Sequence, residues 1–173
     1  MLLETNRLLV RRLREEDAEA LFAVLSDPEV MRYIEPPFTL AQTRSFIREA
    51  ALCEPPLVYG VVWKGKPAAS PVLIGHLIWH PWDETAMELG WILRRDFWGR
   101  GIAGELTAAI LEQTRRDVVI ECCPDQSATR RLAARFGFTL RPLPSQELLT
   151  FYRKGPQQDQ ALPGPEVLGS IRD

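Results

Sequence analysis

The sequence lacks a surplus of positive charge. Its 21 lysine and arginine side chains are outnumbered by 23 aspartate and glutamate side chains, which gives a formal net charge of −2. Proteins that bind nucleic acid usually carry a basic surface, so this balance argues against a nucleic-acid partner. A small cationic substrate is compatible with it.

Long apolar runs are also absent. No stretch reaches the roughly 20 apolar residues that a membrane-spanning helix needs, and residues 1–13 are too charged for a signal peptide. Cysteine is also scarce. The three cysteines, Cys53, Cys122 and Cys123, are odd in number and have no C-x-x-C spacing. We therefore expect reduced thiols that pack mainly as small apolar groups, a cytoplasmic location and no membrane partner.

Candidate metal ligands are equally sparse. His76 and His80 lie four residues apart in an extended run, so they share one face of the predicted strand. No third ligand is spaced to complete a metal site, and packing or hydrogen bonding is the favoured role of both side chains. We expect no metal.

The length of 173 residues suits one domain with a sizeable core. Extended and amphipathic runs follow one another in the order β-α-α-β-β-β-α-β-α-β-β, which predicts an α/β (α+β) fold with one mixed central sheet. Two helical crossovers, over 101–116 and 126–136, are expected to make the neighbouring strands parallel. From Gly155 onward large apolar residues become few, so we predict a folded domain over 1–154 and a tail rich in Pro, Gly and Gln over 155–173.

Two local signals place helix ends. Thr39 and Gln42 have the spacing of a capping box, which predicts a helix from Leu40 to about Ala51. Gly137 is expected to end the last helix, because glycine is favoured just beyond a helix C-terminus.

The chain is organised around a glycine-rich turn, Phe97–Leu106, between a strand-like run and a helix-like run. Gly99, Gly101 and Gly104 lack Cβ atoms where a ligand would approach the main chain, and the first N–H groups of the following helix point back at the turn. This combination predicts an anion site, and a turn without a ligand is the alternative.

The same three glycines match the G-x-G-x-x-G dinucleotide fingerprint. In that fingerprint the first glycine follows the strand almost at once, whereas here residues 94–98 intervene. The acidic residue expected about 20 positions later has only Asp117 and Glu121 as candidates. The turn therefore argues against NAD, and the lack of Gly-Lys-Ser/Thr excludes a P-loop.

Four motifs together resemble a known family. They are T-N-R-L-L-V-R at Thr5–Arg11, which is similar to a T-x-R-L-x-L-R start, E-L-G-W at Glu88–Trp91, the W-G-R-G-I-A-G-E turn at Trp98–Glu105, and D-Q-S-A-T-R-R-L at Asp125–Leu132 followed by F-G-F. In this order they resemble the GNAT superfamily of acyl-CoA-dependent N-acetyltransferases, and within it the RimJ/RimL-like group. The resemblance covers the chain to about Lys154. It implies a GNAT-like single domain whose mixed sheet has about seven strands, flanked by about four helices. It also implies a V-shaped splay between strands four and five, here 85–93 and 118–123.

The sequence departs from the family pattern at four positions. Trp98 stands where Gln or Arg is usual, which should leave the backbone cradle intact. Gln126 replaces Asn and Thr129 replaces Ser, so contacts to the cofactor arm or thiol are altered. Ala133 occupies the place of a tyrosine that serves as the acid in many relatives, so we do not expect a tyrosine mechanism.

The resemblance implies acetyl-CoA as co-substrate. Main-chain groups of the turn would hold its pyrophosphate, and the strand before the turn would pair with the pantetheine arm. A backbone N–H near Ile92 would polarise the thioester carbonyl. The cofactor-binding residues implied in this way are Trp91, Ile92, Leu93, Gly99, Arg100, Gly101, Ala103, Gly104 and Gln126.

An amine must lose a proton before it attacks, because an alkyl ammonium has a pKa of about 10. Glu88 is the candidate base, since it lies in an apolar strand where desolvation would raise its pKa. A solvated or ion-paired role for Glu88, Glu121 as the base, and a water relay stay open. Thr129 is the candidate acid for the departing thiolate, with a plain helix-start role as the alternative.

The same resemblance places Tyr33, Glu35 and Phe38 beside the acceptor pocket. The expected acceptor is a primary amine, such as a protein N-terminus, an amino acid or another small amine. A non-catalytic acyl-CoA-binding sensor or regulatory module is the alternative function. Relatives that dimerise also allow a homodimer, which the sequence does not decide.

Overall fold

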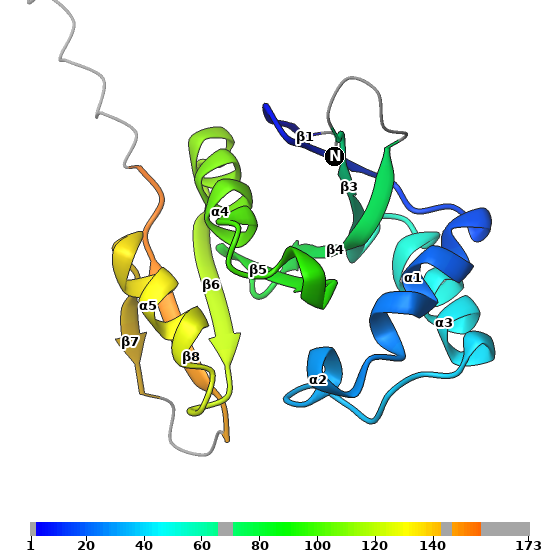
Figure 1. Ribbon diagram of the computed structural model, residues 1–173. Coiled ribbons are helices and arrows are strands. Elements are labelled where there is room, and N and C mark those ends of the chain that lie inside the picture. The colour runs from blue at the N-terminus through cyan, green and yellow to red at the C-terminus, as the bar shows by residue number, and fades with distance from the viewer. Residues whose placement is uncertain (1–2, 66–70, 143–146, 157–173) are drawn as a thin grey trace, which may run out of the picture.

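A computed structural model describes residues 3–65, 71–142 and 147–156. One sheet of eight strands runs through it, in the spatial order β1-β2-β3-β4-β5-β6-β8-β7. Figure 1 labels most of these elements along the chain. The strands are β1 (Leu3–Glu4), β2 (Leu8–Arg11), β3 (Val58–Trp63), β4 (Val72–Pro81), β5 (Ala86–Leu93), β6 (Asp117–Cys122), β7 (Thr139–Arg141) and β8 (Leu149–Arg153).

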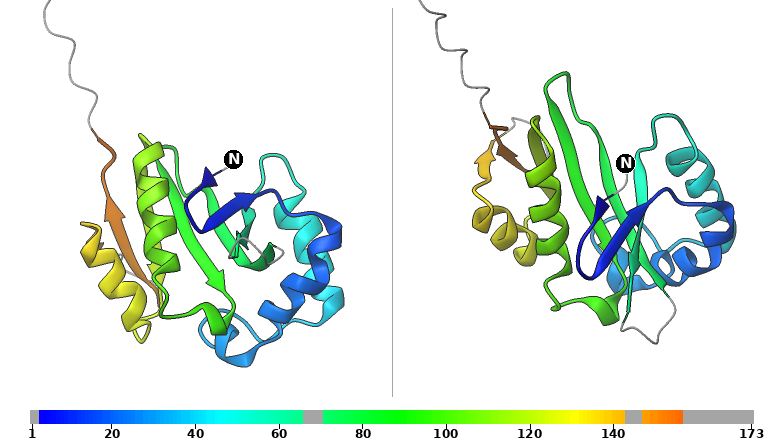
Figure 2. Two further views of the ribbon diagram at one scale, coloured as in Figure 1. Left: turned by 45° about the horizontal axis from the view of Figure 1, so that its top comes forward. Right: turned by 90° about the horizontal axis from the view of Figure 1, so that it is seen from above.

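Helices cover both faces of the sheet. Helices α1 and α3 lie on one side and α4 and α5 on the other, as the two views of Figure 2 show. The α-helices are α1 (Ala18–Leu25), α2 (Pro28–Met31), α3 (Leu40–Phe46), α4 (Ile102–Gln113) and α5 (Ser127–Arg135). The described residues thus form the predicted mixed α/β domain, with eight strands rather than about seven and five α-helices rather than about four. None of these helices, in the part of the chain described, is long and apolar enough to span a membrane.

Two apolar cores follow from this layering. On the side of α4 and α5 the sheet contributes alternate residues such as Leu77, Leu89 and Ile120, all buried. On the side of α1 and α3 it contributes Val62 and Ile92, among others. Because side chains alternate across a strand, each central strand supplies both cores.

Strands β5 and β6 form the parallel pair of the described sheet, and they separate after a short distance. Their register pairs are Ala86 with Asp117, Met87 with Val118 and Glu88 with Val119. Beyond that point Leu89–Leu93 pairs only with β4, and Ile120–Cys122 pairs only with β8. The expected V-shaped splay is therefore present, and Glu88 lies at its fork.

The second crossover does not behave as predicted. Helix α5 leads into β7, which was expected beside β6, but β8 lies between the two and pairs with both. Thr150 and Phe151 of β8 are buried, whereas all three residues of β7 are exposed. The more apolar last strand takes the inner place, so β7 runs parallel to β6 without pairing with it.

The predicted C-terminal tail, 155–173, lies almost wholly outside the described residues. Only Gly155 and Pro156 belong to the described part. The N–H of Gly155 donates to Asp117 Oδ1 at 2.8 Å, which fixes the end of the domain to the start of β6.

Candidate active site

The glycine-rich loop connects β5 to α4. Gly99 and Gly101 have φ angles of 71° and 75°, a region that favours glycine because a Cβ atom would be strained there. Gly101 is the residue that precedes the first turn of α4, and no side chain of the described residues caps this end. The first N–H groups of α4 are therefore free to bind an anion.

The outer side of this loop is open. A Cβ atom placed on Gly99 would meet nothing within 4 Å, and one placed on Gly104 would come no nearer than 3.9 Å to Phe136. Two guanidinium groups lie close by, since Arg94 and Arg100 are 5.1 and 4.9 Å from the ring centre of Phe97. Asp96 offsets the charge of Arg94, because its Oδ2 lies 2.6 Å from Arg94 Nη2. The loop thus combines backbone donors and space with the positive charge of Arg100.

Trp98 joins the loop to the end of β5. Its indole Nε1–H donates to the carbonyl oxygen of Leu93 at 2.7 Å, while 48% of the residue stays exposed. This bond explains how a tryptophan replaces the usual Gln or Arg without disturbing the cradle, because its polar atom is used inside the fold.

Beyond the fork, the side of β5 that faced β6 has no partner strand among the described residues, although Leu93 O accepts from Trp98 Nε1. Trp82 N donates to Ala86 O at 3.0 Å and Arg94 N donates to Ile74 O at 2.8 Å, so even-numbered positions of β5 face β4. Backbone groups alternate along a strand, and those of Trp91 and Leu93 therefore face the opening. The N–H of Ile92 points toward β4 instead of into the splay.

Glu88 lies at the fork and has a partner that the sequence analysis missed. It is the cross-strand neighbour of His80 in the β4–β5 pair, and His80 Nε2 is 3.4 Å from Glu88 Oε2. The other ring nitrogen of His80, Nδ1, lies 2.9 Å from the carbonyl oxygen of Pro81 and must donate to it. The Nε2 atom of His80 therefore faces the Glu88 carboxylate.

The surroundings of Glu88 suit a base. Its side chain is 23% exposed, and burial raises the pKa of its carboxyl group. The positive charge of His80 lowers this pKa in part, and the negative charge of Glu121 raises it further. Glu121 lies on β6 on the same face of the sheet, where the buried Thr150 hydroxyl donates to its Oε1 at 3.0 Å.

His80 lies opposite Glu88 because Pro81 pairs with Met87, which sets the register of the β4–β5 hairpin. No local sequence signal indicated this register. His76, considered with His80 as a metal ligand, is instead 2% exposed, and its ring centroid lies 5.2 Å from that of Phe46. No group of three or more potential metal ligands occurs among the described residues.

Gln126 and Thr129 lie beyond the end of β6, on the other arm of the splay. The Oε1 atom of Gln126 accepts from the N–H of Cys123 at 2.8 Å, which stabilises the turn before α5. Thr129 lies in the first turn of α5 and is half-buried. Ala133, where relatives carry a tyrosine, is fully buried in the core.

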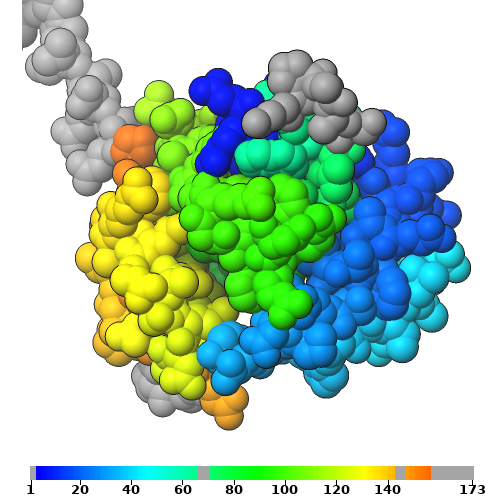
Figure 3. All heavy atoms as spheres, viewed as in Figure 1, coloured from blue at the N-terminus to red at the C-terminus, as the bar shows by residue number. Residues whose placement is uncertain are grey.

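The predicted acceptor residues follow α2. Tyr33 and Glu35 are exposed, and Cys123 Sγ donates to Tyr33 O at 3.5 Å, which brings this segment to the end of β6. Figure 3 shows the two segments meeting on the surface, the blue segment after α2 beside the yellow start of α5. Phe38 packs against Phe46, with ring centroids 6.1 Å apart, so it lies toward α3.

The family model of the acetyltransferase (GNAT) domain matches residues 7–139 of this sequence. The chain belongs to the GNAT acetyltransferase family. A curated relative, the uncharacterized N-acetyltransferase YoaA of Bacillus subtilis, is 30% identical over 149 residues, which cover 79% of this chain and 82% of YoaA. This GNAT protein is therefore an acyl-CoA-dependent acetyltransferase.

Solved structures agree with the assignment. The GNAT acetyltransferase of Bacillus anthracis superposes with a TM-score of 0.73 at 25% identity, over 88% of this chain and 96% of that one. The fold is also that of RimL, described as a ribosomal L7/L12 alpha-N-protein acetyltransferase in complex with coenzyme A. Its TM-score is 0.72 at 20% identity, over 89% of this chain and 98% of RimL.

Proposed function

We propose that this GNAT acetyltransferase moves the acetyl group of acetyl-CoA to a primary amine by direct attack on the thioester, as a member of the RimJ/RimL-like group. The observation that carries the proposal is the position of Glu88. A half-buried carboxylate lies at the fork, where the open edge of β5 begins. Five residues separate the end of this edge at Leu93 from Gly99 of the loop.

The loop and the open edge supply the cofactor site. N–H groups of Arg100, Gly101, Ala103 and Gly104 bind the pyrophosphate at the start of α4. The pantetheine arm lies along β5 as an added strand, and Gln126 lines its far side. Because the N–H groups of Trp91 and Leu93 face the opening, one of them polarises the thioester carbonyl and stabilises the oxyanion.

Glu88 removes the proton that the amine must lose, directly or through a water molecule. Nitrogen then forms a bond to the thioester carbon and the carbon–sulfur bond breaks. The nitrogen releases its second proton and the thiolate takes up one proton, through the Thr129 hydroxyl or a water molecule that is reprotonated in turn. His80 shares the proton that Glu88 has taken, because its Nε2 faces the carboxylate. Ala133 cannot supply the acid that a tyrosine supplies at this position in many relatives.

The acceptor is a protein N-terminus, an amino acid or another small amine. Tyr33 and Glu35 border it, since their segment reaches the end of β6, and Glu35 attracts the ammonium form. RimL acts on the N-terminus of a ribosomal protein, and its shared fold is the only support that it lends to a protein N-terminus as the acceptor. A cytoplasmic location, a homodimer and the absence of a metal stay predictions.

Calorimetric titration with acetyl-CoA, and with NADH as the control ligand, tests the proposal. We expect saturable binding of acetyl-CoA without a response to NADH, followed by amine-dependent thiol release in a panel of acceptors. Binding of NADH in place of acetyl-CoA would refute the cofactor site. Binding of acetyl-CoA without turnover on any amine would favour a non-catalytic acyl-CoA sensor.

A further inference from the structure

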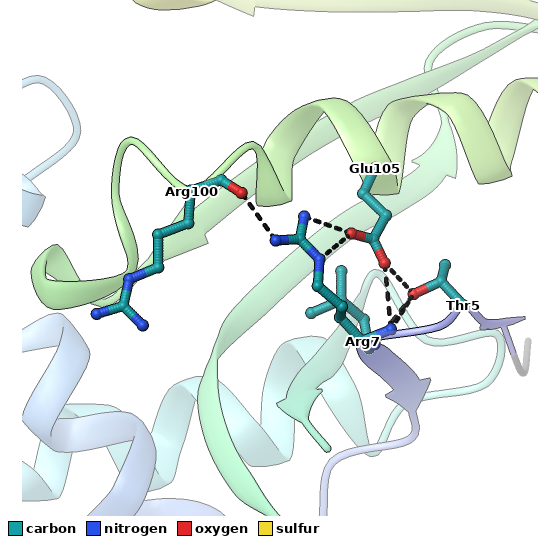
Figure 4. A network of polar contacts seen from close by, with 5 residues as sticks. Thr5, Arg7, Arg100 and Glu105 are labelled. Carbon is teal, nitrogen blue, oxygen red and sulfur yellow. Dashed lines mark hydrogen bonds and ion pairs between the residues drawn. The ribbon is translucent and has the colours of Figure 1, made fainter. Parts of the chain in front are cut away.

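A polar network joins the N-terminal strands to the glycine loop (Figure 4). Arg7 Nε donates to Glu105 Oε2 at 2.6 Å, and Arg7 Nη2 lies 2.5 Å from the same oxygen. The Thr5 hydroxyl donates to Glu105 Oε1 in a short hydrogen bond. Arg7 Nη1 donates to the carbonyl oxygen of Arg100 at 3.0 Å. Residues about 100 positions apart in sequence are thereby fixed to one another.

We propose that Arg7 is a positioning residue for cofactor binding, which sets the orientation of the peptide between Arg100 and Gly101. A trans peptide is planar, and its C=O and N–H point in opposite directions. With the Arg100 carbonyl held by Arg7, the Gly101 N–H points away from Arg7 and outward from the loop. This inference rests on the proposed function, in which that N–H binds the pyrophosphate.

The loop needs such a support because its own backbone is permissive. Gly99 and Gly101 both have positive φ angles, and glycine moves between many backbone conformations at little cost. A site that is already ordered before binding loses less entropy on binding. The side chain of Arg7 is itself held on a second side, where its guanidinium lies 5.6 Å from the ring centre of Trp63.

Charge gives Arg7 a second task. Glu105 lies in the first turn of α4, close to the place proposed for the pyrophosphate. Burial raises the pKa of Glu105, but hydrogen bonds from Thr5 and Arg7 outweigh this effect and hold it below its ordinary value. Glu105 therefore stays negative, and Arg7 offsets a charge that would repel the phosphates.

The test compares CoA with S-acetyl-pantetheine, which lacks the pyrophosphate, in the Arg7→Gln protein. We expect the affinity for CoA to fall roughly 10-fold to 100-fold, as for loss of a charged hydrogen bond, and that for S-acetyl-pantetheine to stay unchanged. The KM for acetyl-CoA should rise in this variant as the affinity for CoA falls, while kcat at saturation changes less than about twofold. Arg12→Gln is the matched control, because Arg12 forms an exposed ion pair with Glu54 at 2.8 Å away from the loop.

A double variant separates the two tasks of Arg7. If Arg7 acts only by offsetting charge, Arg7→Gln/Glu105→Gln regains CoA affinity, which would overturn the role in peptide orientation. If Arg7 orients the peptide, the affinity of the double variant for CoA stays low. Arg7→Lys keeps the positive charge but lacks the planar guanidinium with its several N–H donors. If Arg7→Gln does not fold, the affinities for CoA and S-acetyl-pantetheine are compared in Arg7→Lys instead.

The outcomes distinguish this inference from the proposed function. Failure of the wild-type protein to bind CoA would refute the function itself. Wild-type binding with equally tight binding by Arg7→Gln would refute only the role of Arg7. Equal losses for CoA and S-acetyl-pantetheine would show general destabilisation and would also refute it.

Discussion

Replacement of Glu88 by glutamine removes the proposed base and keeps the shape of the side chain. An alkyl amine with a pKa near 10 is only about 0.1–1% neutral between pH 7 and 8. Without a base, the enzyme depends on this neutral fraction. We expect kcat/KM to fall roughly 10²-fold to 10³-fold at pH 7.5, which lies within the usual effect of general base catalysis.

The deficit should depend on pH. Each unit of rising pH supplies about ten times more neutral amine, so the variant recovers and the gap closes to less than about tenfold near pH 9.5. In the wild-type protein kcat/KM should fall as pH drops through the pKa of Glu88, which burial holds above its ordinary value of 4.5. Thiol release with a primary alkylamine acceptor, measured across pH 5 to 10, is the assay.

Two controls make the result decisive. Glu121→Gln, on the same face of the sheet, should keep turnover and move the acid limb to lower pH, because the charge of Glu121 raises the pKa of Glu88. Glu112→Gln, on the exposed side of α4, should change nothing. Turnover unaffected by Glu88→Gln would remove Glu88 from the mechanism, and loss of acetyl-CoA affinity in that variant would point to a structural role instead.

Two further predictions follow from backbone strain and burial. Gly101→Ala, at φ 75°, should lower the free energy of unfolding by about 1–2 kcal/mol and weaken acetyl-CoA binding in calorimetry. Gly137→Ala, also at φ 75°, should cost the same stability without changing affinity. Burial lowers the pKa of His76 to about 4. The unfolded chain therefore takes up the proton first, and stability falls between about pH 6.5 and 4. In urea titrations His76→Leu should reduce this loss by about 3 kcal/mol, and an unchanged pH dependence would contradict the assignment.

Much of the element order could be predicted because its signals are local. The capping box is present, since Gln42 N donates to Thr39 Oγ1 at 3.2 Å and Thr39 N donates to Gln42 Oε1 at 2.8 Å. The helix that follows extends to Ala51 as expected, although Ile47–Ala51 winds as a π-helix. Gly137 ends α5 with a positive φ angle.

The rest of the fold and of the site depends on contacts between distant residues, which no local sequence pattern predicts. The pairing of β8 between β6 and β7 is decided by competition between two late strands for one buried place. The bonds between Arg7 and Glu105 join residues 98 positions apart, and the two motifs that contain these residues do not indicate that they pair. The fork was predicted from the family resemblance, whereas its cross-strand histidine required the register of β4 and β5.

The separation of β5 from β6 divides the sheet into one half of five strands and another of three. Only three register pairs join the halves along this described seam. A cofactor arm bound in the gap would contact both halves of the sheet and hold them together while it is bound. A ligand present at 100 times its Kd stabilises a folded protein by about 2.7 kcal/mol, and here that energy would be concentrated across the seam. Bound acetyl-CoA would then make opening of the seam rarer, besides supplying the acetyl group.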